Sequence, residues 1–178
     1  GGRQGDISGG ETAHQRVMFW AEGMTTIFAQ PFSILTGLGM GWFLDANGHV
    51  AHNSFIQAYV EIGLFGGGSF LAAFYLSART LHRLGREVIA PRWVVQARHF
   101  AFAAVVGYAV GCYSLTRNYV IPTYLVLGIA SILLDRATPA LPERFRVNGS
   151  WFRWVVLFSI CGMGLVKLAT QALGLAGV

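Results

Sequence analysis

Residues 48–68 read GHVAHNSFIQAYVEIGLFGGG, and this stretch decides the fold because a polar loop passes there directly into an apolar helix. Asn53 is of a residue type that caps helices well, so we expect the helix to begin at Ser54. His52 then lies where the loop meets the helix entrance, and Glu61 follows about two turns further along. We expect the residues before this stretch to build a site around His52, and those after it to anchor that site.

Apolar residues dominate the chain and are bunched into runs. Of the 178 residues, 54% are hydrophobic and only 12% are charged, with a mean hydropathy of +0.51, whereas a soluble domain has about 25% charged residues. The composition therefore predicts an all-α integral membrane protein. Because the opening residues are polar and the first is glycine, we interpret the chain as the C-terminal part of a larger multi-span protein.

The runs predict about four transmembrane helices, preceded by an extracytoplasmic amphipathic helix and loop. Within residues 1–53, a helix is expected over 11–30, where apolar residues recur at steps of three and four until Pro31. Its apolar run is too short to span the bilayer, so we expect it to lie at the membrane surface or against the missing part of the chain. The transmembrane region, 54–178, is predicted to hold spans at 54–78, 99–115, 119–134 and 154–175.

The distribution of arginine predicts the orientation. Five arginines lie within residues 79–98 and four within residues 136–153, and cytoplasmic loops carry the excess of basic residues. Residues 1–53, with His52, and the C-terminus would then face the periplasm, in a multi-pass protein of the bacterial inner membrane. Flanking charge also explains the net charge of +5, so we expect no nucleic acid partner.

His52 is the candidate catalytic residue. Near neutral pH an imidazole can take a proton from a hydroxyl nucleophile; the alternative is an interfacial histidine that only hydrogen-bonds a loop. His49 lies three residues earlier, with Asp45 nearby, but no third strong ligand accompanies them. We therefore expect no metal here.

Two arginines are candidates for binding an anionic substrate. Arg16 lies in the amphipathic helix, four residues before Trp20, and a guanidinium can grip a pyrophosphate through two hydrogen bonds. Arg117 lies in the turn between the two middle spans, from where it could reach a phosphate in the same site. The alternatives are an arginine on the solvated side of a helix and a plain turn charge.

Glu61 needs a partner, because an ionised carboxylate within a membrane helix is costly. It is expected either near the outer interface or paired with a cation, for which Arg16, Arg117 and a protonated His52 are the candidates. Its position therefore indicates either a substrate-binding role or support of the helix entrance.

Two groups of glycines flank these residues. The glycines at 63, 66, 67 and 68 would let another helix or backbone approach closely, with helix packing as the default interpretation. The run Gly37-x-Gly39-x-Gly41 predicts a flexible turn or, alternatively, backbone N–H groups that approach phosphate oxygens.

In order along the chain, these features form a set that resembles the C-terminal half of the O-antigen ligase and polysaccharide polymerase family. The set comprises Arg16-x-x-x-Trp20, Pro31, Gly37-x-Gly39-x-Gly41-x-Phe43, His52-Asn53 and Glu61-x-Gly63-Leu-Phe-Gly66. The resemblance covers residues 10–80, and beyond them only the pattern of spans. It implies a metal-independent, inverting glycosyl transfer, without a cofactor, from an undecaprenyl-pyrophosphate-linked glycan to an acceptor hydroxyl.

By this resemblance His52 would be the base or would orient the acceptor, and Arg16 would hold the pyrophosphate. Asn53, Glu61 and Arg117 would complete the substrate site. The implied partners are the lipid-linked donor, a glycan or lipid A-core acceptor, membrane lipid, and further N-terminal spans of the same polypeptide.

The sequence leaves several functions open. A polymerase and a ligase differ only in their acceptor, and a protein O-oligosaccharyltransferase would have a similar core. The alternative from another class is a non-enzymatic transporter or assembly subunit for envelope polysaccharide export, in which Glu61 and Arg117 line a polar path.

Overall fold

The computed structural model describes residues 9–87, 91–137 and 149–172. In chain order the helices are α1 (Gly9–Ala29), α2 (Ser33–Thr36), α3 (Trp42–Asn47), α4 (Ser54–Glu87), α5 (Arg92–Ser114), α6 (Ile121–Ala137) and α7 (Gly149–Ala172). Within these ranges no strand is formed. The prediction of an all-helical chain is therefore confirmed.

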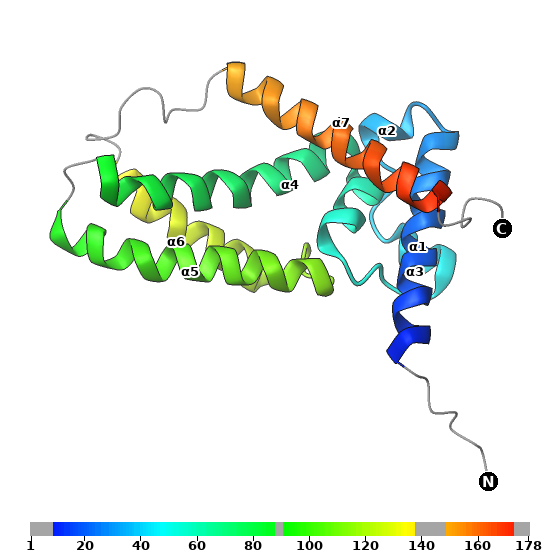
Figure 1. Ribbon diagram of the computed structural model, residues 1–178, viewed down its shortest axis with the longest axis horizontal. Helices are drawn as coiled ribbons and strands as arrows, with labels where there is room; N and C mark the ends of the chain where they lie inside the picture. The colour runs from blue at the N-terminus through cyan, green and yellow to red at the C-terminus, as the bar shows by residue number, and fades with distance from the viewer. Residues whose placement is uncertain (1–8, 88–90, 138–148, 173–178) are drawn as a thin grey trace, which may run out of the picture.

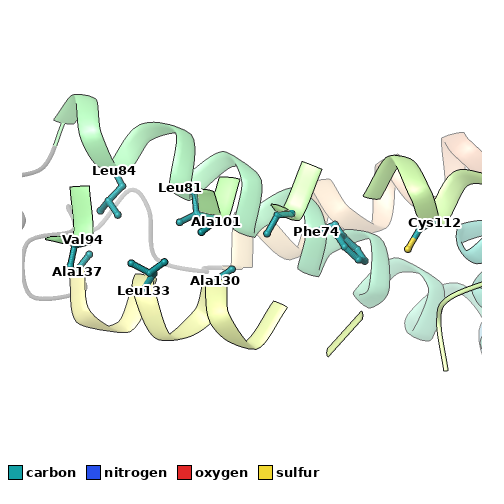
Figure 2. Close-up of a cluster of buried hydrophobic side chains, with 10 residues drawn as sticks. Phe74, Leu81, Leu84, Val94, Ala101, Cys112, Ala130, Leu133 and Ala137 are labelled. Atoms are coloured by element: carbon teal, nitrogen blue, oxygen red, sulfur yellow. The ribbon is translucent and has the colours of Figure 1, made fainter. Parts of the chain in front are cut away.

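Helices α4, α5 and α6 run side by side along the long axis, and α7 passes over α4 to reach α1 (Figure 1). A cluster of buried apolar side chains holds the first three of these helices together (Figure 2). Its members are Phe74, Leu81 and Leu84 of α4, Val94, Ala101, Val105 and Cys112 of α5, and Ala130, Leu133 and Ala137 of α6. Burial of this apolar area stabilises the bundle.

A second apolar cluster fixes the short helices onto the beginning of α4. Met24 and Ile27 of α1, Phe43 of α3, Val60 of α4 and Met163 of α7 are among its buried members. The loop that was expected to follow the amphipathic helix contains the short helices α2 and α3. It is therefore packed against α1 and α4, and it can hold functional groups in place.

Two described helices are long and apolar enough to cross a membrane, over Ser54–Leu84 and Arg92–Ser114. A shorter apolar helical stretch covers Phe152–Leu165. Helix α6 has 17 residues, which corresponds to about 25 Å of helix, against about 30 Å of hydrocarbon. Length and composition thus identify two candidate spans.

The helix ends differ from the predicted ones where arginine lies near a boundary. Helix α4 continues to Glu87, past the predicted end at 78, and α5 begins at Arg92, before the predicted start at 99. Arginine is a good helix former, so charge ends an apolar run without ending the helix. The last predicted span, 154–175, extends partly beyond the described residues.

Helix α4 is kinked at Gly63, whose φ of 69° and ψ of −169° are not helical. A side chain there would meet backbone, because a Cβ atom would lie 2.3 Å from the Leu35 carbonyl oxygen and 2.5 Å from the Gly37 nitrogen. In turn, a Cβ at Gly37 would lie 2.2 Å from the Glu61 carbonyl oxygen. The two glycines therefore let the loop after α2 and the kink of α4 touch, backbone against backbone.

This crossing is a close approach of backbone of the kind that the glycines from 63 to 68 predicted. Gly63 permits the kink. Gly68 does face α7, since a Cβ there would lie 3.0 Å from Ser159 Oγ. Close helix packing thus accounts for only part of the pattern.

Candidate functional site

Asn53 caps α4, as the sequence predicted. Its Oδ1 accepts hydrogen bonds from the backbone N–H groups of Phe55 and Ile56, at 3.0 and 3.1 Å. The side chain is 1% exposed. Both hydrogen bonds of its oxygen lie within the protein, so Asn53 fixes the helix entrance.

His52 lies directly before the cap in a left-handed backbone conformation, with φ of 52°. Such a conformation is uncommon outside glycine and persists where neighbouring contacts enforce it. The His52 N–H donates to Thr116 Oγ1 at 3.1 Å, and the carbonyl of Ala51 accepts from Trp20 Nε1 at 2.5 Å. Contacts from α1 and from the α5–α6 connection therefore hold the backbone around His52.

The structure places Arg16 near enough to His52 for its positive charge to act on the imidazole. Burial is the main cause that lowers the pKa of His52 below 6.5, and the positive charge of Arg16 and the neighbouring His49 lower it further. The imidazole is half-buried. It is therefore mostly neutral at pH 7, which is the form that accepts a proton.

Arg16 is half-buried on α1. Its Nε is buried, without a hydrogen-bond partner among the described residues. A buried guanidinium N–H without a partner is unusual, and it leaves Arg16 with an unused hydrogen-bond donor.

Glu61 is 1% exposed, and its oxygens accept from neutral donors. Oε1 accepts from Gln57 Nε2 at 3.1 Å and from the Phe43 N–H at 3.5 Å, and Oε2 accepts from Tyr119 O–H at 2.6 Å. The sequence suggested Arg16, Arg117 or His52 as its partner. An amide, a phenol and a backbone N–H stabilise the carboxylate instead.

Three residues of this polar network were not singled out from the sequence. Thr116 accepts from the His52 N–H and donates to Gln57 Oε1 at 3.0 Å. Tyr119 has an exposed ring, whereas its hydroxyl points inward. Burial of that hydroxyl is the main cause that raises the pKa of Tyr119, and the hydrogen bond and charge of Glu61 raise it further. The residues come from α4 and the α5–α6 connection, so no local sequence pattern unites them.

Arg117 lies at the same end of the molecule as His52. Its backbone N–H donates to Ser54 Oγ at 2.7 Å, and Ser54 Oγ donates to the Leu115 carbonyl at 2.6 Å. The Arg117 side chain itself is exposed. Its backbone thus joins the α5–α6 connection to the start of α4, while its guanidinium remains accessible.

The glycine-rich loop uses its N–H groups within the protein. Those of Leu38 and Gly39 donate to the carbonyls of Val60 and Glu61, at 2.8 and 3.1 Å. These carbonyls precede the kink at Gly63. The N–H groups of Leu38 and Gly39 therefore take the place of helical donors for these two carbonyls. Because both N–H groups are already bonded within the protein, this argues against their binding a phosphate.

Comparison with known proteins gives no template for this arrangement, since no protein-family model, no curated protein and no solved structure matches the chain. Among the described residues no three His, Cys, Asp or Glu side chains gather in a group that could hold a metal ion. Of the five candidate residues from the sequence, Asn53 and Glu61 use their side-chain oxygens within the protein, which leaves His52, Arg16 and Arg117 as candidates for chemistry.

Proposed function

We propose that this chain forms part of an inverting membrane glycosyltransferase, which moves a glycan from undecaprenyl pyrophosphate to an acceptor hydroxyl. The observation that carries the proposal is the proximity of His52 and Arg16, close enough for the arginine charge to lower the pKa of the imidazole. The ordered motif set of residues 10–80, which resembles the O-antigen ligase and polysaccharide polymerase family, agrees with this chemistry.

The chemistry needs one base and one cation. Neutral His52 takes the proton of the acceptor hydroxyl while the oxygen attacks the anomeric carbon. The bond between that carbon and the pyrophosphate oxygen breaks, and the electron pair leaves with the pyrophosphate. Arg16 stabilises the charge of this leaving group through its guanidinium, and Arg117, which follows the Thr116 that bonds the His52 N–H, would assist.

For the membrane, we propose that α4 to α7 cross the bacterial inner membrane with His52 facing the periplasm. The end of α4, the start of α5 and the end of α6 lie at one end of the long axis (Figure 1), and these segments carry Arg79, Arg83, Arg92 and Arg136. His52 lies at the opposite end, before the start of α4. This separation fits an excess of arginine on the cytoplasmic side.

The transporter alternative receives less support from the site. It requires Glu61 to line a polar path, yet Glu61 is 1% exposed and accepts hydrogen bonds from Gln57, Tyr119 and the backbone. A carboxylate held in this way supports neighbouring structure.

A complementation experiment tests the proposal. In a strain that lacks the gene encoding this chain, the wild-type gene should restore the glycan profile on gels, and His52→Ala should lose about 10²–10⁴-fold of the transfer rate. His49→Ala is the matched control, because His49 is exposed and three residues earlier; it should restore the profile.

The type of defect identifies the acceptor. Short chains in the deletion strain indicate a polymerase, and unligated lipid-linked glycan indicates a ligase. A normal glycan profile with His52→Ala would refute the proposed base, and a normal profile in the deletion strain itself would refute glycosyl transfer.

A further inference from the structure

A continuous chain of hydrogen bonds links His52 to a buried carboxylate about two turns away in α4. The His52 N–H donates to Thr116 Oγ1 at 3.1 Å, and Thr116 Oγ1 donates to Gln57 Oε1 at 3.0 Å. Gln57 Nε2 then donates to Glu61 Oε1 at 3.1 Å. Each donor in this chain points toward Glu61.

A second branch reaches the same carboxylate from the other side. Tyr119 O–H donates to Glu61 Oε2 at 2.6 Å, a short hydrogen bond of the charge-assisted kind. Gln57 and Glu61 are 3% and 1% exposed, so water competes little for these groups. Hydrogen bonds that run in one direction in such a place polarise and strengthen one another.

This chain of hydrogen bonds stabilises the backbone conformation of His52. With φ at 52° it occupies a conformation that costs an ordinary residue free energy and that surrounding contacts have to maintain. The bond to Thr116 acts on the His52 amide itself. Its strength depends on Gln57 and Glu61, which orient the threonine hydroxyl so that its lone pair faces the amide.

We propose that Thr116 and Gln57 are positioning residues, anchored by Glu61, that hold the His52 backbone so that its imidazole is aimed at the acceptor hydroxyl. This inference rests on the proposed function, since the role of His52 as the base is assumed. Gln57 is buried and the Thr116 hydroxyl bonds the His52 N–H and Gln57, so we expect neither residue to contact the substrate. Their loss therefore lowers the turnover number and leaves the affinity for the lipid-linked donor unchanged.

The test uses Thr116→Val, which keeps the shape of the side chain but removes the hydroxyl. With the protein reconstituted in lipid, we expect kcat to fall about 10-fold or more, because small misplacements of a catalytic group are costly, while KM for the donor stays within about 2-fold. Thr116→Ser restores the hydroxyl and should restore kcat. Thr26→Val is the matched control, because Thr26 Oγ1 bonds only its own helix, at the Glu22 carbonyl.

A second measurement is independent of activity. Hydrogen exchange of the His52 amide should be about 10-fold faster in Thr116→Val, if the lost bond is worth about 1.4 kcal/mol. Unchanged exchange would show that Thr116 does not hold the amide. Faster exchange with normal kcat would overturn the positioning role and leave the proposed function intact, whereas full activity of His52→Ala would overturn the proposed function itself.

Discussion

Replacing Gly63 by alanine tests whether the backbone crossing between the kink of α4 and the loop after α2 holds the site together. Its φ of 69° and ψ of −169° lie in a region that is essentially restricted to glycine, at a cost of about 1–3 kcal/mol for another residue. The new Cβ would also lie 2.3 Å from the Leu35 carbonyl oxygen. Because that atom belongs to the backbone of α2, both α2 and the loop after it have to move.

Movement of the loop breaks two hydrogen bonds, from the Leu38 and Gly39 N–H groups to the carbonyls of Val60 and Glu61. Each contributes about 0.5–1.5 kcal/mol to stability. With the backbone term, the free energy of unfolding should fall by about 2–6 kcal/mol. A chain of this size loses about 2–4 °C in Tm for each kcal/mol, so Gly63→Ala should lower Tm by roughly 4–24 °C.

Gly48→Ala is the matched control. Gly48 has a similar φ of 67°, but a Cβ there would meet nothing within 4 Å. Only the left-handed backbone penalty of about 1–2 kcal/mol remains, or about 2–8 °C in Tm. Thermal unfolding of both variants in the same detergent, followed by circular dichroism, measures the difference. Equal losses in the two variants would refute the backbone crossing.

Two further predictions concern the helix entrance. Asn53→Ala should lower the free energy of unfolding by about 1 kcal/mol, because the Phe55 and Ile56 N–H groups lose their cap. Asn53→Asp keeps the acceptor oxygen and should change the free energy of unfolding little. Equal losses for the two variants in the same melting assay would count against the cap. The folded state lowers the pKa of His52 below 6.5, so the unfolded chain binds more protons than the folded one when the pH falls below 6.5. The free energy of unfolding should therefore decrease as the pH falls below 6.5 and stay flat above it. His52→Gln should reduce the difference between the Tm values at pH 5 and pH 7.5, and an unchanged difference would contradict the shift.

The sequence predicted the parts of this structure that depend on neighbouring residues. Asn53 followed by an apolar helix is a local signal, and the cap is present at that residue. The apolar runs likewise predicted the helices, although not their ends, because the pattern of charge does not report where helical hydrogen bonds stop. Helix α4 accordingly continues past Arg79 and Arg83 to Glu87.

Contacts between residues that are far apart in the chain could not be predicted from the sequence. Gly37 and Gly63 are 26 residues apart, and nothing near either one indicates that their backbones touch. Tyr119 is separated from Glu61 by 58 residues. A buried carboxylate predicts that it has a partner, but either a cation or a set of neutral hydrogen-bond donors can stabilise it. Which of the two is present depends on the tertiary structure.

The kink at Gly63 explains why the site belongs to the tertiary structure and not to α4 alone. Residues 54–62 form a short first segment of helix, whose carbonyls at Val60 and Glu61 accept from the glycine-rich loop. A segment of this length has little stability of its own, so its orientation is set by what packs against it. Trp20 of α1 and Thr116 of the α5–α6 connection bond the residues just before it, at Ala51 and His52. The backbone at His52 is therefore held by three elements that are far apart in the sequence: α1, the α5–α6 connection and the glycine-rich loop that packs on the first segment of α4.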